Sequence, residues 1–108
     1  MTRFVVTDTA AAARATAQLD QAGRMLATSI RAASQDLDQL HGDPGRAAEL
    51  LARWRRRQVQ VERYENELLL VLAECGASER SLAGLMHIGR PAVTARLARA
   101  RDERESAA

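Results

Sequence analysis

Two long stretches of apolar residues at helical spacing, separated by one strong turn signal, constrain the fold of this chain most. The apolar positions of the first stretch are Leu19, Ala22, Leu26, Ile30, Ala33, Leu37 and Leu40. Steps of three and four place such residues on one helical face. The turn signal is His-Gly-Asp-Pro-Gly at 41–45, where Asp43 can cap a new helix with Pro44 at its first position. We therefore expect helices over about 9–41 and 44–75.

The second stretch has a heptad pattern, which is typical of helices that pack side by side as in a coiled coil. Its main positions are Ala47, Trp54, Val61, Leu68 and Cys75. Two amphipathic helices joined by a tight turn predict an antiparallel helical hairpin over residues 1–76. A monomeric hairpin would leave apolar surface uncovered, so we expect this region to form a homodimer. The expected interface residues are Leu19, Leu26, Ile30, Leu37, Leu50, Trp54, Val61, Tyr64 and Leu68.

The composition favours a single all-α domain in a reducing compartment. Hydrophobic residues make up 46% of the 108 residues, but aromatic residues only 3%, and alanine and leucine favour helices. A single cysteine, Cys75, excludes an internal disulfide. No run approaches the roughly 18 apolar residues of a membrane span, and the N-terminus is a poor secretory signal. We expect a cytoplasmic protein that does not bind a membrane.

The sequence lacks the common signatures of catalysis and metal binding. His41 and His87 lie far apart, and no Cys/His cluster has metal-ligand spacing. There is no glycine-rich phosphate loop and no nucleophile elbow. We expect neither an enzyme nor a cofactor.

The segment 77–108 is predicted to be a broken pair of short helices. Gly76 ends the preceding helix in a left-handed conformation, and Ser78 can cap a helix over 79–86. Gly89 then caps a second helix, which tolerates Pro91 in its first turn because the amide there has no intrahelical partner. The residues expected to face inward are Leu82, Leu85, Met86, Ile88, Val93 and Leu97.

Basic charge is concentrated in this same segment. All 16 basic residues of the chain are arginine, and the net charge is only +2. Residues 79–101, however, contain five arginines and one glutamate, a local charge of +4. Arginine offers a planar donor fork that suits a phosphate or a guanine edge. The charge therefore favours an anionic partner for this segment.

The stretch SERSLAGLMHIGRPAVTARLARAR resembles the helix-turn-helix segment of bacterial and phage DNA-binding proteins. The matching positions are Leu82, Ala83, Met86, Ile88, Val93 and Leu97. The resemblance covers residues 78–101 only, and the hairpin matches no such family. One departure is His87, which stands where the motif usually has glycine; a residue other than glycine adopts the required left-handed conformation at some cost, and histidine is among the less strained choices.

The resemblance implies that the second helix of the pair enters the major groove of double-stranded DNA. The base-contact candidates on this second helix are Arg90, Thr94 and Ala95. The phosphate candidates are Arg80 and Ser81 near the start of the first helix, and Arg99 toward the end of the second. Pro91 and Arg101 complete the expected DNA-binding surface. Arg96 can contact phosphate or form a salt bridge with Glu79 or an acidic residue of the hairpin. A homodimeric, sequence-specific transcriptional regulator would read half-sites about 34 Å, or a multiple, apart.

Several alternatives remain open. One is a helical protein-interaction adaptor or antirepressor, and another is a non-specific nucleoid-associated protein. The basic stretch 54–58 indicates a solvated helix face anchored by tryptophan, or else an accessory phosphate contact. Residues 102–108 are too short and polar to form the wing of winged-helix proteins. The β-favouring residues 4–6 are expected to form an arm against the core or to add to a partner's strand.

Overall fold

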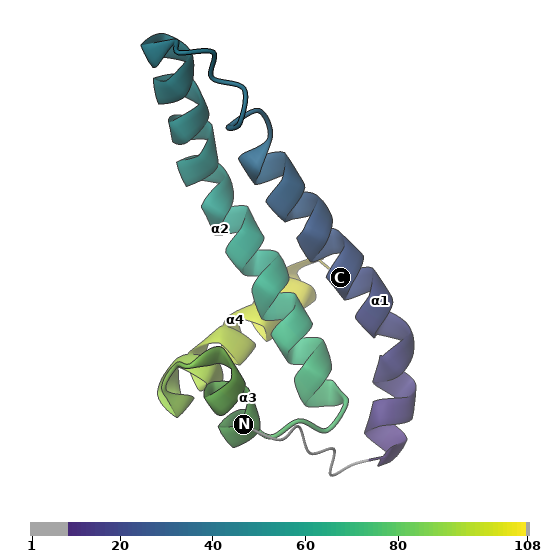
Figure 1. Ribbon diagram of the computed structural model, residues 1–108. Coiled ribbons are helices and arrows are strands. Elements are labelled where there is room, and N and C mark those ends of the chain that lie inside the picture. The colour runs from purple at the N-terminus through teal and green to yellow at the C-terminus, as the bar shows by residue number, and fades with distance from the viewer. Residues whose placement is uncertain (1–8, 108) are drawn as a thin grey trace.

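The computed structural model describes residues 9–107, and these form four helices joined by short connections (Figure 1). The helices are α1 (Thr9–Ser34), α2 (Pro44–Glu74), α3 (Glu79–Met86) and α4 (Arg90–Ala107). Helices α1 and α2 run antiparallel as a long hairpin, and α3 and α4 lie beside the C-terminal half of α2. The predicted all-α fold, with a long hairpin followed by two further helices, is confirmed. Residues 4–6, for which an arm was expected, lie outside the described part of the chain.

The start of α2 follows the local sequence signals. The Asp43 carboxylate accepts hydrogen bonds from the backbone amides of Gly45 and Arg46, at 2.9 and 3.3 Å. Pro44 occupies the first helical turn, where its missing amide costs no hydrogen bond. Both features were predicted from the turn signal at 41–45. They position the second arm of the hairpin.

The predicted end of the first helix is wrong, because α1 ends at Ser34 and not near residue 41. The Ser34 hydroxyl bonds to the carbonyl of Ile30 at 3.0 Å, a local interaction that competes with regular helix geometry. Asp36 then adopts a left-handed backbone conformation (φ 69°), which breaks the helix. Leu37 and Leu40, which the spacing placed on the helix, lie half-buried in the connection. The spacing of apolar residues alone does not indicate where the backbone leaves the helix.

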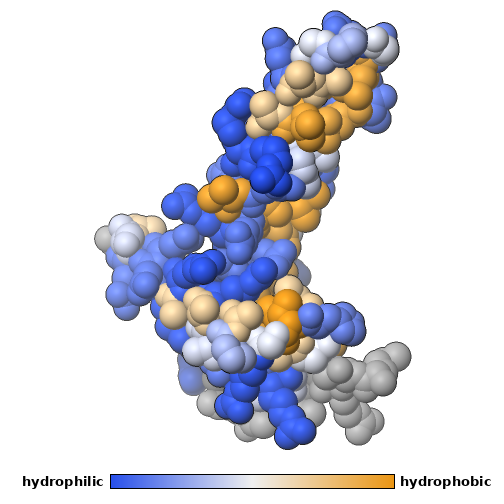
Figure 2. All heavy atoms as spheres, turned by 90° about the vertical axis from the view of Figure 1, so that its left-hand side faces the viewer, coloured by the Kyte–Doolittle hydropathy of each residue, from blue (hydrophilic) through white to orange (hydrophobic). Residues whose placement is uncertain are grey.

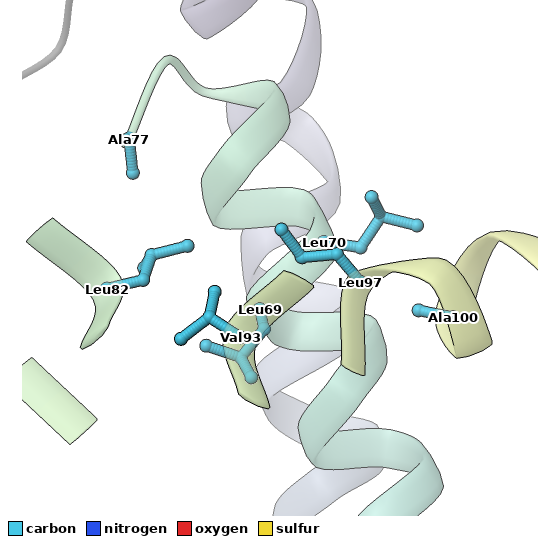
Figure 3. Close-up of a cluster of buried hydrophobic side chains, with 7 residues drawn as sticks. All are labelled: Leu69, Leu70, Ala77, Leu82, Val93, Leu97 and Ala100. Atoms are coloured by element: carbon cyan, nitrogen blue, oxygen red, sulfur yellow. The ribbon is translucent and has the colours of Figure 1, made fainter. Parts of the chain in front are cut away.

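The C-terminal half of α2 is buried on two sides. One side contributes to a core with the two short helices, formed by Leu69, Leu70, Ala77, Leu82, Val93, Leu97 and Ala100 (Figure 3). The other side forms a second core with α1, made by Ala15, Ala22, Val71 and Cys75. This half of α2 therefore lies between α1 and the α3–α4 pair. It is the element that fixes α4 relative to the hairpin.

The distal arm of the hairpin, residues 25–59, is covered less completely. Figure 1 shows α3 and α4 at the opposite end of the hairpin, and Figure 2 shows hydrophobic side chains along the surface of the arm. Its exposed large hydrophobic residues are Met25, Ile30, Leu51 and Val59. None of the helices in the described range is long and apolar enough to cross a membrane.

Most residues predicted for a dimer interface are at least partly covered within a single chain. Leu50 is buried, Ile30 is 44% exposed and the other seven are half-buried. The apolar period of each helix is thus largely used to join α1 to α2. A contact surface for a second copy therefore has to include residues outside this predicted set. The exposed large hydrophobic residues of the distal arm are available for it.

We expect Leu97→Ala to lower the free energy of unfolding by about 2–5 kcal/mol, because it leaves a cavity where α4 meets α2. Leu97 is only 1% exposed. Leu85→Ala is the matched control, since Leu85 is 43% exposed and should cost about 1 kcal/mol or less. Urea unfolding followed by circular dichroism, at one protein concentration, measures both. Equal losses in the two variants would contradict the assigned core.

Candidate nucleic-acid interface

The chain bends between α3 and α4 at the residues that the sequence predicted. His87 ends α3 in the left-handed conformation (φ 56°, ψ 40°), and its amide donates to the carbonyl of Ala83. The amide of Ile88 donates to the same carbonyl at 3.2 Å. The carbonyl of Gly89 accepts from the amides three and four residues on, and α4 begins there. His87 thus supplies the left-handed turn that the resemblance associates with glycine.

The N-terminus of α3 is held by serine side chains. The Ser78 hydroxyl accepts a hydrogen bond from the backbone amide of Ser81 at 3.1 Å, as the predicted cap requires. It also donates to the Ser81 hydroxyl at 3.0 Å. Ser81, a predicted phosphate contact, is therefore half-buried and already hydrogen-bonded in the free chain. Its backbone amide and hydroxyl both serve to fix the start of α3.

The inward face of α3 differs at one position from the prediction. Leu82 is 1% exposed and Met86 packs against the same core, but Leu85 remains 43% exposed. Leu82 and Met86 are four residues apart and lie on the same side of the helix. Leu85 lies on the flank of that side. A helix of eight residues with one neighbour buries a single narrow stripe.

Helix α4 has a buried and an exposed side, as expected for a helix that presents one face to a partner. Val93, Leu97 and Ala100 are at most 2% exposed. The predicted contact residues outside this buried stripe are all exposed, namely Arg90, Pro91, Thr94, Ala95, Arg99 and Arg101. Arg80 on α3 is exposed as well. The structure therefore leaves the predicted base-contact residues accessible together.

Glu79 joins the beginnings of α3 and α4. One oxygen of its carboxylate, Oε2, accepts a hydrogen bond from the Thr94 hydroxyl at 3.0 Å. The same oxygen lies 3.7 Å from Nε of Arg90, whose side chain is 70% exposed. Two of the three residues expected to read bases, Arg90 and Thr94, therefore share one acidic neighbour. From the sequence, Glu79 was expected only as a salt-bridge partner of Arg96.

Arg96 is held by the hairpin. It forms an ion pair with Glu65 and approaches Glu62 to 3.9 Å, and its side chain is 25% exposed. Of the two roles that the sequence left open, the ion pair with acidic residues of the hairpin is the one that this structure contains. Arg99 also approaches Glu62, at 3.8 Å, but 64% of its side chain remains exposed. Arg96 is thus a tether between α4 and α2, whereas Arg99 is available to an anion.

The last turns of α4 carry a second set of ion pairs to α2, which was not predicted from the sequence. Arg104 bridges two glutamates of α2, with Nη1 at 2.9 Å from Glu74 and Nη2 at 2.6 Å from Glu67. These hydrogen bonds, the one to Glu74 above all, raise the pKa of Arg104 above its ordinary value. A signal was present: Arg104 follows Leu97 by seven residues, and Glu67 precedes Glu74 by seven. Such spacing places each pair on one helical face.

The arginines of the α3–α4 pair therefore differ in how strongly they are held. Arg96 and Arg104 are fixed to α2, while Arg90 and Arg99 approach a carboxylate no closer than 3.7 Å. Arg80 and Arg101 are exposed and form no ion pair with any residue between 9 and 107. Exposed guanidinium groups on two neighbouring helices can donate to phosphate oxygens or base edges. This is the chemistry that the surface offers.

Comparisons of the chain with protein-family models, with curated proteins and with solved structures find no significant match. Among the described residues there is also no group of three histidine, cysteine or acidic side chains that could hold a metal ion.

We expect His87→Gly to raise the free energy of unfolding by about 0.5–1 kcal/mol. Glycine adopts the left-handed conformation of His87 without a steric penalty, and this gain exceeds its entropic cost in the unfolded chain. His87→Val should instead lower stability by about 1 kcal/mol, because a β-branched residue is strained at positive φ. Thermal unfolding of the three proteins measures both effects. Equal stability of the glycine and valine variants would contradict the left-handed turn.

Proposed function

We propose that this protein binds double-stranded DNA in a sequence-specific manner and acts as a small homodimeric transcriptional regulator of bacterial or phage type. The observation that carries the proposal is the two-sided character of α4. Val93 and Leu97 fix its inner side, while Arg90, Thr94 and Ala95 are all exposed. A helix presented in this way fits the major groove of B-DNA, where side chains near its N-terminus meet base edges.

Each of the three proposed base-contact residues of α4 has a suitable partner on DNA. Arg90 donates to the O6 and N7 acceptors of guanine, and Ala95 packs on a thymine methyl group. Thr94 offers a hydroxyl or a methyl group. Arg80 and Arg99 contact phosphates on either side of the groove, which gives affinity without sequence information. Arg96, held at α2 in the free chain, contributes mainly by keeping α4 in place.

The proposed homodimer presents two copies of α4 to successive turns of DNA. Support comes from the distal arm, where Leu51 is 57% and Val59 is 64% exposed. Both residues lie on α2, and exposed hydrophobic side chains that gather into a patch mark interaction surfaces. Pairing there leaves α4 free at the other end of the hairpin. As a cytoplasmic regulator, the protein has no catalytic role in this proposal.

The same exposed residues favour one second candidate, a helical adaptor that docks another protein. In that case the arm would bind the partner, and the arginines of α4 would be a solvated surface. Binding to DNA with a steep salt dependence distinguishes the regulator, because phosphate contacts release counterions. A non-specific nucleoid protein would show the salt dependence without a preferred sequence.

Selection of bound duplexes from a random pool is the first test of the function, and variants of α4 are the second. We expect Arg90→Ala to weaken binding to the selected site by about 1–3 kcal/mol and to relax the preference for guanine at one position. Arg99→Ala should weaken binding evenly across sequences and reduce the salt slope by about one unit. Fluorescence anisotropy over a salt series measures both. An unchanged sequence preference in Arg90→Ala would remove this residue from base readout.

The dimer has a separate test in light scattering of the free protein. We expect the mass of a dimer for the wild type and of a monomer for Leu51→Glu combined with Val59→Glu, because two buried charges per chain without partners oppose association. Arg56→Glu serves as control, since Arg56 is an exposed polar residue of the same helix. A wild-type monomer at high concentration would contradict the proposal, as would a dimer that the double variant leaves intact.

A further inference from the structure

Glu79 is placed where it can decide how α4 meets DNA. It lies in the first turn of α3, and its side chain is 33% exposed. Its Oε2 atom is within 3.0 Å of the Thr94 hydroxyl and 3.7 Å of Arg90 Nε. No other acidic side chain among the described residues contacts either of them. A single carboxylate therefore contacts two of the three residues that are proposed to read bases, Arg90 and Thr94.

The contact determines which part of Thr94 is available. Its hydroxyl has two acceptors within reach, Glu79 Oε2 at 3.0 Å and the backbone carbonyl of Arg90 at 3.1 Å. A hydroxyl has one proton, and an ionised carboxylate is the stronger acceptor. Either choice commits the hydroxyl proton to the chain itself. Thr94 then cannot donate to a base, and it is left with its hydroxyl oxygen as an acceptor and its methyl group, whose apolar counterpart is a thymine methyl.

The contact also leaves the reading end of Arg90 available. The guanidinium approaches Glu79 through Nε, which is the nitrogen nearest the helix. The two terminal nitrogens lie beyond it, and they are the pair that binds the O6 and N7 atoms of guanine end-on. Arg90 can therefore bind guanine while its Nε stays beside Glu79. A phosphate that draws the guanidinium away from α3 would instead separate the ion pair.

We infer that Glu79 is a specificity-determining residue that positions Arg90 and Thr94 for base readout and disfavours binding to arbitrary DNA. The inference rests on the proposed function. On the correct site the ion pair persists, and the carboxylate is compensated. On other sequences Arg90 contacts only phosphate, which leaves an uncompensated carboxylate near the DNA backbone and costs Coulomb energy. Glu79 thus raises the ratio of specific to non-specific affinity without contacting a base.

The test compares Glu79→Gln with a control that removes the same charge elsewhere. Glutamine keeps an acceptor for Thr94 but removes the ion pair with Arg90. Glu49→Gln is the matched control, because Glu49 is exposed near the start of α2, at the end of the hairpin remote from α4 (Figure 1). Anisotropy titrations use the selected duplex and a scrambled duplex of equal length. The salt concentration is varied in both.

We expect Glu79→Gln to bind the scrambled duplex about threefold to tenfold more tightly and the selected duplex with little change. The salt slope on scrambled DNA should become steeper by about one unit, because Arg90 is released to phosphate. The specificity ratio then falls by the same factor, whereas Glu49→Gln leaves it unchanged. A purely structural role in capping α3 would weaken both duplexes alike. An unchanged ratio in Glu79→Gln, or an equal drop in Glu49→Gln, overturns the inference.

A measurement without DNA separates this inference from the proposed function. In nuclear magnetic resonance spectra, the Nε proton of Arg90 should exchange with water faster in Glu79→Gln than in wild type, while that of Arg104 stays unchanged. An equal exchange rate for Arg90 in both proteins overturns the contact and with it the inference. A wild type that selects no DNA sequence overturns the proposed function itself, whatever the exchange rates show.

Discussion

The packing of α4 on the C-terminal half of α2 is the contact on which the rest of the structure depends. Leu69 and Leu70 of α2 receive Val93 and Leu97 of α4, and none of the four is more than 3% exposed. On its other side this half of α2 packs against α1 through Val71 and Cys75. The α3–α4 pair therefore packs on one side of a helix whose other side packs against α1. This attachment fixes the inner side of α4 and leaves its outer side to a partner.

Ion pairs reinforce the same arrangement and divide the arginines into two groups. Arg96 and Arg104 bind glutamates of α2, so part of the positive charge that the sequence concentrates in this segment is neutralised by the hairpin. Arg90 and Arg99 lie farther from their carboxylates and remain mostly exposed. The first group holds α4 in place, and the second is available to an anion. Glu79 is related to both groups. It contacts the start of α4, and it does so by pairing with an exposed arginine.

The hairpin combines two different surfaces along its length. Near α4 it is covered on both sides of α2, while the distal arm exposes Leu51 and Val59. This separation is compatible with the proposal that association and DNA binding use different parts of the molecule. It also means that a substitution at one end need not disturb the other.

Local signals in the sequence were sufficient for much of this structure. Asp43 and Ser78 cap helices as predicted, and the bend at His87 occurs where the broken pattern placed it, because caps and turns depend on residues within a few positions of one another. The exposed side of α4 was also predicted, since a helix with Val93 and Leu97 buried has its opposite side fixed by the helical period. The end of α1 was missed, because a left-handed residue such as Asp36 changes the backbone while the apolar spacing continues.

Only the tertiary structure decided which groups meet across helices. Apolar spacing shows that a residue is covered but not by what, so Leu50, predicted at a dimer interface, is buried within its own chain. Ion pairs are even harder to predict from the sequence, because it does not distinguish an exposed arginine from a paired one. The ties of Arg96 to Glu65, and of Arg90 and Thr94 to Glu79, depend on how two helices cross. The sequence by itself determined the helices, their caps and the outward side of α4, whereas the fold selected the acidic partners, because long-range contacts follow from packing in three dimensions.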